Sequence, residues 1–233
     1  MSAARQSTSV QAAEPSLDSG VAAYRRLREA IVGGAFHPNQ RLVEADLTRL
    51  LSAGRTTVRA ALVRLDQEGL VVRDPNRGAR VRLVTDQEAL EIEQVRAALE
   101  RLVVRHAAER ATDRDLCELR DILSEMARRV EEGDPLGYSE MNGRFHQRIW
   151  AIGDQGVASR LLANLKSQSI RFQYRTILEP GRPPRSLGEH ERIVEALATR
   201  DPDAAEVAMR EHLNRVVETL KKAISRKHGG SLP

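Results

Sequence analysis

Apolar residues recur every three or four positions through most of the chain, a spacing that predicts amphipathic helices. In the first 70 residues the pattern predicts three short helices, over 21–32, 44–51 and 56–68. Gly33-Gly34 ends the first helix, and Gly69 ends the third because glycine readily adopts the left-handed conformation at that position.

The hydrophobic period changes to two after the third helix. Residues 70–73 are a β-rich run, residues 74–78 a turn cluster, and residues 79–84 alternate apolar with polar side chains. This succession predicts a β-hairpin, and residues 41–44 are expected to be only a short link. Two helices, a turn, a third helix and a hairpin describe a winged helix-turn-helix.

Beyond residue 84 every apolar pattern is helical, and capping residues mark where helices begin. Residues 179–184 contain three prolines and are expected to form a loop, with Ser186 capping the helix that follows. The predicted helices span about 85–110, 112–132, 135–151, 155–178, 186–199 and 202–225. The predicted fold is mainly α: a winged helix-turn-helix with a small β-hairpin wing, then an all-α six-helix antiparallel bundle.

These patterns divide the chain into four segments. Residues 1–20 are expected to be a disordered tail and residues 226–233 a polar tail. Between them lie the winged helix-turn-helix, residues 21–85, and the helical domain, residues 86–225.

The composition agrees with a core of packed helices and excludes several classes of protein as candidates. Hydrophobic residues make up 41% of the chain but aromatic residues only 3%, so the core must consist of Leu, Val, Ile and Ala. The single cysteine, Cys117, excludes a disulfide framework and a cysteine zinc finger, and is expected to be a buried or inert thiol. No apolar run approaches the roughly 20 residues that span a bilayer, and no secretory signal opens the chain, so a cytoplasmic location is expected.

Positive charge is concentrated in the N-terminal third. Residues 1–85 contain thirteen arginines and no lysine against eight acidic residues, whereas residues 86–233 carry a net charge of −1. This asymmetry indicates a module that binds a polyanion joined to a neutral one, although charge also fluctuates along ordinary chains.

The third helix carries side chains suited to DNA. Its first turn holds Arg55, Thr56, Thr57 and Arg59, and the hairpin tip holds Arg77-Gly78. In a winged helix-turn-helix this helix enters the major groove, where the arginine fork pairs with guanine and threonine hydroxyls meet phosphates. Positive charge at a helix N-terminus opposes the helix dipole, so an anion is expected there; a solvated helix start is the alternative.

Five motifs in this region resemble a known family. They are Tyr24-x-x-Leu27-Arg28-x-x-Ile31, Arg41-Leu42-Val43-Glu44-x-x-Leu47, Arg55-Thr56-x-Val58-Arg59-x-Ala61-Leu62, Leu65-x-x-x-Gly69-Leu70 and Asn76-Arg77-Gly78. With them, residues 21–84 resemble the DNA-binding domain of GntR-type bacterial transcription regulators. The resemblance implies that Arg55, Thr56, Thr57, Arg59 and Arg77-Gly78 contact DNA. Gly54, Ala60 and Ala45 depart from the family pattern, so the operator sequence does not follow.

Histidines stand out in the helical domain. Asn142 and His146 are four residues apart and share a helix face, while His190 and His212 fall in the last two predicted helices. A bundle can bring all four to one interior point, where three imidazoles and an oxygen suit Zn²⁺, Ni²⁺ or Mn²⁺ with positions left open. By spacing alone, separate structural histidines are the commoner alternative.

Four further motifs extend the resemblance to the helical domain. They are Glu93-x-x-Arg96-x-x-Leu99-Glu100, Asn142-x-x-Phe145-His146-x-x-Ile149, Glu189-His190-x-x-Ile193-x-x-Ala196-Leu197 and Asp201-x-x-x-Ala205-x-x-Ala208-Met209-x-x-His212-Leu213. Residues 86–225 thereby resemble the helical effector-binding domain of the FadR branch, called FCD, and six helices fit its VanR-like subgroup. The resemblance implies a divalent metal held by Asn142, His146, His190 and His212. Asn142 replaces the usual aspartate, and its amide oxygen can ligate a metal but lacks the charge.

The resemblance also implies that a carboxylate of the effector, a small organic or sugar acid, occupies open metal positions. Such an acid needs a cationic partner. Arg96 is the candidate, with an ion pair to Glu93 or Glu100 as its alternative role. Arg171 and Arg175 are weaker candidates.

Two other functions compete with regulation. A metal-dependent hydrolase needs a general base beside the metal-bound water, but Glu189 and Glu211 point about 100° away from the histidines that follow them. No HExxH, GxSxG or phosphate loop is present, so an enzyme is not expected. The second alternative is a nucleoid-type protein that binds DNA without sequence preference.

The sequence therefore predicts a homodimeric transcription regulator that responds to a ligand. It would bind a palindromic double-stranded operator, one half-site per subunit, and repress a catabolic operon until the effector releases it.

Overall fold

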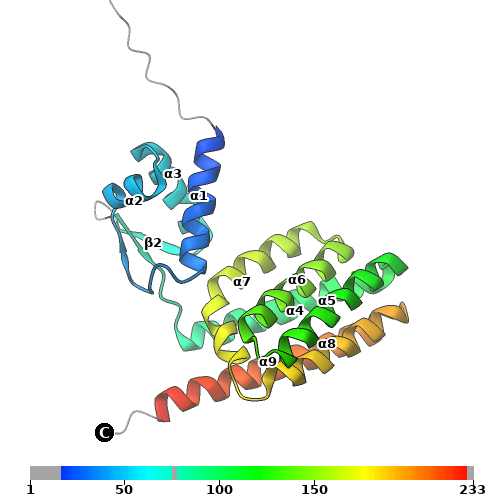
Figure 1. The fold of residues 1–233 in the computed structure, drawn as a ribbon. Coiled ribbons are helices and arrows are strands. Elements are labelled where there is room, and N and C mark those ends of the chain that lie inside the picture. The colour runs from blue at the N-terminus through cyan, green and yellow to red at the C-terminus, as the bar shows by residue number, and fades with distance from the viewer. Residues whose placement is uncertain (1–16, 75–77, 230–233) are drawn as a thin grey trace, which may run out of the picture. The chain divides into compact units, whose positions relative to one another are not determined.

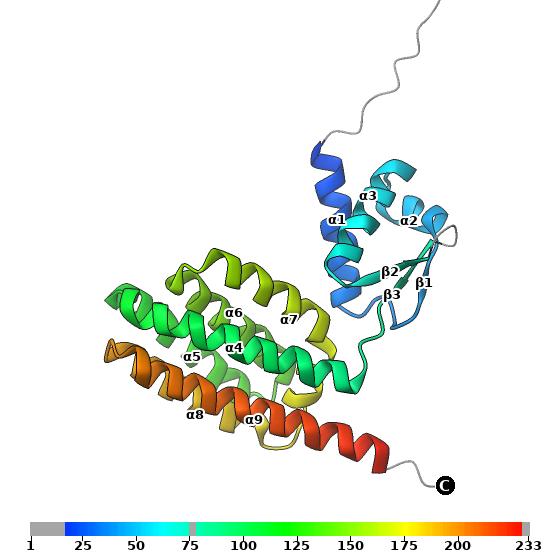
Figure 2. The same cartoon turned by 180° about the vertical axis from the view of Figure 1, so that it is seen from behind.

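The structure is a computed structural model that describes residues 17–74 and 78–229. The described chain divides into two compact units after Leu83, each with its own core (Figures 1 and 2).

The N-terminal unit combines a three-helix core with a small sheet. Its helices and strands, in chain order, are α1 (Leu17–Val32), β1 (Arg41–Leu42), α2 (Glu44–Leu51), α3 (Arg55–Gln67), β2 (Val71–Asp74) and β3 (Gly78–Val81). The helices and hairpin are the predicted winged helix-turn-helix.

The sheet holds one strand more than predicted. Its order is β1-β3-β2, all antiparallel, and Leu42 of β1 pairs with Ala79 of β3. The expected link at residues 41–44 therefore begins with a strand, which two residues are too few to reveal by alternation. Gly78 opens β3 with a φ of 88°, and a Cβ there would lie 3.1 Å from the Leu42 carbonyl oxygen, so glycine suits this approach of strands.

The C-terminal unit is entirely helical. Its helices are α4 (Asp86–Arg110), α5 (Asp113–Glu131), α6 (Pro135–Gly153), α7 (Gly156–Ile177), α8 (Arg182–Ala198) and α9 (Pro202–Gly229). Helix α4 packs against α6, α7 and α9, while α5 packs against α6 and α8 (Figure 2). Side chains of Leu119, Phe145, Ile149 and Ile193 are fully buried between them. The core is aliphatic, as the composition predicts.

Capping residues fix where three of these helices begin. The Thr85 side chain accepts a hydrogen bond from the Glu88 amide at 3.1 Å, and Thr112 forms a reciprocal capping box with Asp115. The Asp134 carboxylate accepts from the Gly137 amide at 2.9 Å, before a proline in the first turn of α6.

Helix α8 begins earlier than predicted. It starts at Arg182, so Pro183 and Pro184 lie in its first turn rather than in a loop. Prolines are tolerated there because the first amides of a helix have no intrahelical partner. Ser186 consequently lies inside the helix and is buried, so its predicted role as a cap is wrong.

Cys117 also differs from expectation: it is exposed on α5 rather than buried. None of the described helices is both long and apolar enough to cross a membrane.

Gly153 provides a test of the packing between α4 and α6. A Cβ at this buried position would lie 2.6 Å from the Val103 carbonyl oxygen, and backbone cannot move aside as a flexible side chain can. We expect Gly153→Ala to lower the free energy of unfolding by about 1–3 kcal/mol, measured by chemical denaturation. Gly156→Ala is the control, because its nearest neighbour would be Arg160 Nη1 at 3.6 Å. Equal stability of the two variants would contradict this packing.

Candidate functional site

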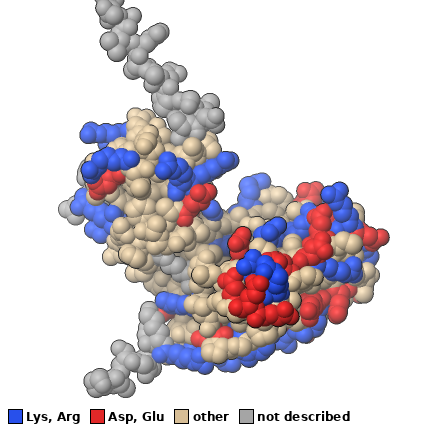
Figure 3. Space-filling view, in the orientation of Figure 1, with Lys and Arg blue, Asp and Glu red and all other residues tan. Residues whose placement is uncertain are grey.

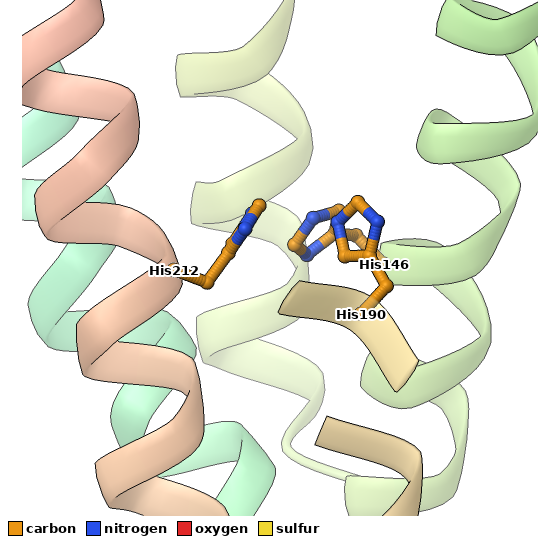
Figure 4. Close-up of side chains that lie close together, drawn as sticks. All are labelled: His146, His190 and His212. Atoms are coloured by element: carbon orange, nitrogen blue, oxygen red, sulfur yellow. The ribbon is translucent and has the colours of Figure 1, made fainter. Parts of the chain in front are cut away.

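Three helices of the C-terminal unit each direct one histidine to the same interior point. His146 comes from α6, His190 from α8 and His212 from α9, and their rings converge in Figure 4. Their available nitrogen atoms lie within 4.8 Å of one another, and all three side chains are buried. Of the four residues that the sequence assigns to a metal, the structure thus gathers the three histidines into one cluster.

Several of these nitrogens lack an ordinary hydrogen-bond partner. Neither ring nitrogen of His190, nor Nδ1 of His146, has one among the described residues. A buried polar atom without a partner costs about 1–3 kcal/mol, so an unfilled cluster would be an expensive feature of the core.

Two histidines of the cluster, His190 and His212, are held in the neutral form. Burial lowers the pKa of His190 well below its usual value, and His146 and His212 beside it act in the same direction. Burial likewise lowers the pKa of His212 to about 4, even though Glu189 favours the charged form. Neutral imidazoles carry the lone pairs that divalent metals bind, so the histidines fit a metal ion.

Glu189 supports His212 from behind. Its Oε2 lies 2.8 Å from His212 Nδ1, and Arg182 donates to both of its oxygens at 2.9 and 2.8 Å. Burial alone would raise the pKa of Glu189, but the hydrogen bonds from His212 and Arg182 lower it to about 2. A carboxylate on Nδ1 leaves Nε2 free as a ligand, an arrangement typical of metal-binding histidines.

Glu189 therefore contacts the cluster through His212 without belonging to it. From the sequence, Glu189 is expected to point away from His190, and it does lie outside the group of three histidines. Its contact with His212 is not predicted from the sequence. That contact joins α8 to α9, and the spacing of residues along either helix does not reveal it.

Glu100 of α4 occupies the corresponding place behind His146. It is fully buried, its Oε1 lies 3.5 Å from His146 Nδ1, and Trp150 Nε1 donates to its Oε2 at 2.7 Å. Burial would raise the pKa of Glu100, but the neighbouring His146 and Arg96 lower it below its usual range. Sequence reasoning considered Glu100 only as a partner for Arg96.

Arg96 lies in the same buried shell. It donates to both carboxylate oxygens of Glu93, at 2.9 and 2.8 Å, and its Nη2 lies 3.5 Å from Glu100 Oε1. Its Nε has no hydrogen-bond partner in the described part of the chain. The ion pair considered from the sequence therefore exists, but it is buried rather than on the surface.

A small cavity of about 40 Å³ connects these groups. It is large enough for a few water molecules. Asn142 contributes to its wall, which places this residue beside His146 and His212. The cavity is lined by Arg96, Tyr138, Asn142, His146, Gln173, Thr176, Ile177, Arg182, Ser186, His212, Leu213 and Val216.

The other two arginines considered from the sequence differ from Arg96. Arg175 Nη1 lies 3.1 Å from Asp86 Oδ1, its guanidinium stacks over Phe172, and it does not line this cavity. Arg171 belongs to α7, but its side chain is outside the described part of the structure. Arg182 lies within residues 179–184, for which the sequence predicts a loop, and it lines the cavity.

The start of α3 forms the second candidate surface. Arg55 and Thr56 are exposed in its first turn, which contains no acidic residue, and its N-cap is Gly54, which offers no side-chain hydrogen bond. The first amides of α3 are thus free of side-chain caps, as an anion-binding helix start requires.

The other four residues predicted to contact DNA are Thr57, Arg59, Arg77 and Gly78. Arg59 is exposed and its Nε lies 2.8 Å from Glu44 Oε2. Thr57 is predicted to contact DNA, but it lies on the inner face of α3 and its side chain is buried. Arg77 lies outside the described residues, whereas Gly78 opens β3.

The two units also differ in surface charge. On the face in Figure 3, basic side chains outnumber acidic ones on the N-terminal unit, while both kinds mix on the C-terminal unit. This agrees with the asymmetry of the sequence and with a polyanion as partner of the N-terminal unit.

Comparison with known proteins identifies both units. Residues 20–81 match the bacterial regulatory proteins of the gntR family, and residues 91–215 match the FCD domain. The chain belongs to the GntR family of FCD-containing regulators. The finer assignment to a branch of the GntR family does not follow from these matches.

GntR relatives extend over nearly the whole chain. The HTH-type transcriptional repressor RspR of Escherichia coli is 30% identical over 199 residues, 85% of this chain and 87% of that protein. The Nta operon transcriptional regulator of Aminobacter aminovorans is 30% identical over 196 residues, 82% of this chain and 90% of that one. The chain is accordingly a GntR transcription regulator, and the family consists of regulators rather than enzymes.

Solved GntR structures share the fold. Escherichia coli McbR/YncC has a TM-score of 0.76 at 22% identity, covering 88% of this chain and 97% of that one. A putative GntR transcriptional regulator from Rhodococcus has a TM-score of 0.70 at 23% identity, covering 88% and 99%. The predicted fold class, winged helix-turn-helix followed by a helical bundle, is confirmed.

Arg182 tests the buried shell around the histidines. Arg182→Met removes both hydrogen bonds to Glu189 and leaves that buried carboxylate with a poorer set of partners. We expect a loss of about 3 kcal/mol in the free energy of unfolding, measured by chemical denaturation. Arg185→Met, about one turn further along α8, is the control. Arg185 is exposed and donates to the backbone oxygens of Gly181 and Pro180. If both variants keep the stability of the parent protein, the shell does not hold α8 against α9.

Proposed function

We propose that this GntR regulator is a cytoplasmic, homodimeric repressor of a catabolic operon, released when a small organic or sugar acid binds at a metal centre. The observation that carries the proposal is the buried three-histidine cluster in a domain joined to a winged helix-turn-helix. The name of the repressor RspR and the names of the Nta and Uxu operon regulators support a role in repressing an operon.

The metal would be Zn²⁺, Ni²⁺ or Mn²⁺, held by His146, His190 and His212 with the amide oxygen of Asn142. The partnerless nitrogens of His190 support this assignment, as does Glu189 behind His212. A bound divalent ion supplies positive charge that attracts a carboxylate.

The effector would enter the cavity beside the histidines. Arg96 Nε is a buried donor without a partner, and Arg182 adds a second guanidinium to the wall. Planar guanidinium groups pair with carboxylates in a fixed geometry, which supports an acid as ligand. The cavity of about 40 Å³ has room for water rather than for an acid, so effector binding would have to widen it. Arg175 and Arg171 remain weaker candidates, since Arg175 already pairs with Asp86.

DNA would be read by the start of α3 and by the wing. Arg55 and Thr56 are exposed there, and the free α3 amides suit a phosphate. The exposed pair of Arg59 with Glu44 is worth about 0–1 kcal/mol, so Arg59 can exchange it for DNA. Arg77-Gly78 would enter the minor groove from the wing.

A homodimer is supported by exposed apolar side chains on α4 and α7. Val95 and Leu102 of α4 are 52% and 44% exposed, and Val157 and Leu161 of α7 are 66% and 49% exposed. The two helices pack together, so a second copy could cover both sets of side chains. The six helices of the bundle further support the VanR-like subgroup of the FadR branch.

The direct test of this function is to select genomic DNA fragments with the purified protein and sequence them. One enriched palindrome beside a catabolic operon is the expected result. Enrichment without any motif would favour a nucleoid-type binder instead.

Arg55 tests the DNA-reading surface on that operator. Arg55→Ala removes an exposed guanidinium at the start of α3, and we expect binding to weaken by about 1–3 kcal/mol, measured by fluorescence anisotropy. Arg120→Ala, on the exposed surface of α5, is the matched control. Unchanged affinity of the Arg55 variant would remove this residue from recognition.

His146 tests the metal centre. At a metal concentration one hundred times the dissociation constant, the parent protein should gain about 2.7 kcal/mol of stability, and His146→Ala should gain none. Thermal unfolding with Zn²⁺, Ni²⁺ and Mn²⁺ measures both. His106→Ala, whose ring pairs with Glu109 outside the cluster, should respond like the parent. Identical unfolding of the parent protein with and without all three metals would contradict the proposal.

Arg96 tests effector recognition separately from the metal. Arg96→Lys keeps the charge beside Glu93 but loses the planar fork, so we expect normal metal content with a loss of at least tenfold in sensitivity to the acid. The readout is release of the operator by a panel of organic and sugar acids. A retained response would point to Arg182, Arg171 or Arg175.

A further inference from the structure

A second hollow is lined mainly by residues of α6 and α7. It is an open groove of about 760 Å³, within the range of small-molecule sites. Among the described residues, Gln173 alone lines both this groove and the histidine cavity. Its wall includes Gly143, Arg144 and Gln147 of α6 and Lys166 and Tyr174 of α7.

Lys166 is the unusual feature of this groove. It makes no hydrogen bond or ion pair with any residue that the structure describes, although most of its side chain is buried. Burial and the charge of Arg96 lower the pKa of Lys166 to about 8, and the charge of Glu100 offsets this only in part. An ammonium that is largely removed from water is stabilised by an anion beside it.

Gly143 makes room for the Lys166 amine. A Cβ at position 143 would lie 2.6 Å from Lys166 Nζ, so the amine occupies the notch that this glycine leaves in α6. Glycine inside a helix costs about 1 kcal/mol relative to alanine. The missing side chain at position 143 therefore leaves room for the amine at the groove wall, an observation that does not depend on the charges.

Among the described lining residues, basic groups outnumber carboxylates by three to two. Arg129 is neutralised within the wall, because its Nη1 lies 2.9 Å from Asp134 and its Nε 2.9 Å from Glu125. Arg144 is exposed beside Gly143 and its guanidinium contacts the sulfur of Met141 at 3.7 Å. Lys166 and Arg144 thus face one further carboxylate in the lining, that of Glu140.

We propose that this groove binds the carboxylate or phosphate group of a small molecule between Lys166 and Arg144, as a ligand site separate from the histidine cavity. Lys166 would contact the anion with an ammonium that has no ion-pair partner among the described residues, and Gly143 leaves room for that ammonium. Arg144 would contact the same anion from the exposed side of the groove. The volume admits a ligand much larger than the histidine cavity can hold.

The test uses the full-length protein, freed of metal, titrated separately with sodium phosphate and sodium succinate at constant ionic strength. Calorimetry measures affinity, and the amide signal of Gly143 in glycine-labelled protein reports the location. We expect saturable binding of at least one probe with a shift at Gly143. Binding of phosphate alone or of succinate alone supports the site and names the group it takes.

Variants separate this site from general charge effects. Lys166→Met and Arg144→Gln should each weaken binding at least tenfold, and Gly143→Ala should weaken it while keeping every charge, because the amine must leave its notch. Lys221→Met makes the same change on the exposed surface of α9 and should leave affinity unchanged.

His146→Ala keeps this binding if the groove is the site, whatever the fate of the metal centre. Three results would overturn the proposal: no saturable binding of either probe, equal losses in the Lys166 and Lys221 variants, or loss of binding in His146→Ala with retention in Lys166→Met. Arg144 is exposed, so its variant decides the matter even if Lys166→Met does not fold.

Discussion

Three imidazole rings meet at a buried point, and several of their nitrogens have no hydrogen-bond partner among the described residues; this is the constraint on which the C-terminal unit depends. They come from α6, α8 and α9, so the three helices must keep their register for the rings to stay within reach of one another. Polar atoms without partners in a core oppose folding. A divalent ion bound there would remove that cost and join the three helices through the same atoms, so metal binding would be coupled to the stability of the bundle.

Around the rings lies a shell of carboxylates and guanidinium groups. Glu189 and Glu100 stand behind His212 and His146, while Arg182 and Arg96 pair with Glu189 and with Glu93 and Glu100. A shell of this kind orients the rings and keeps buried charge in balance. It also puts guanidinium groups at the wall of the cavity, where an acidic effector would change the balance among them. A ligand that interacts differently with two arrangements of helices shifts the population between them.

Sequence patterns predict most of this fold because its signals are local. The i, i+4 periodicity and the caps at Thr85, Thr112 and Asp134 predict where most helices begin and end to within a few residues of the observed bounds. Errors occur where tertiary contacts decide: β1 exists only through its pairing with β3, and α8 begins at Arg182, whose side chain is held by Glu189. The three histidines were found through resemblance and spacing. The roles of Arg182 and Glu189 were missed because they depend on which helices become neighbours, which no periodicity specifies.

The measurement that bears most directly on this account is anomalous X-ray scattering from crystals of the protein grown with zinc, with data collected on both sides of the zinc absorption edge. The account predicts one strong anomalous peak in each chain, bonded to a nitrogen of His146, His190 and His212 at about 2.0–2.1 Å. Crystals that show the three rings in place with no anomalous peak between them would contradict it.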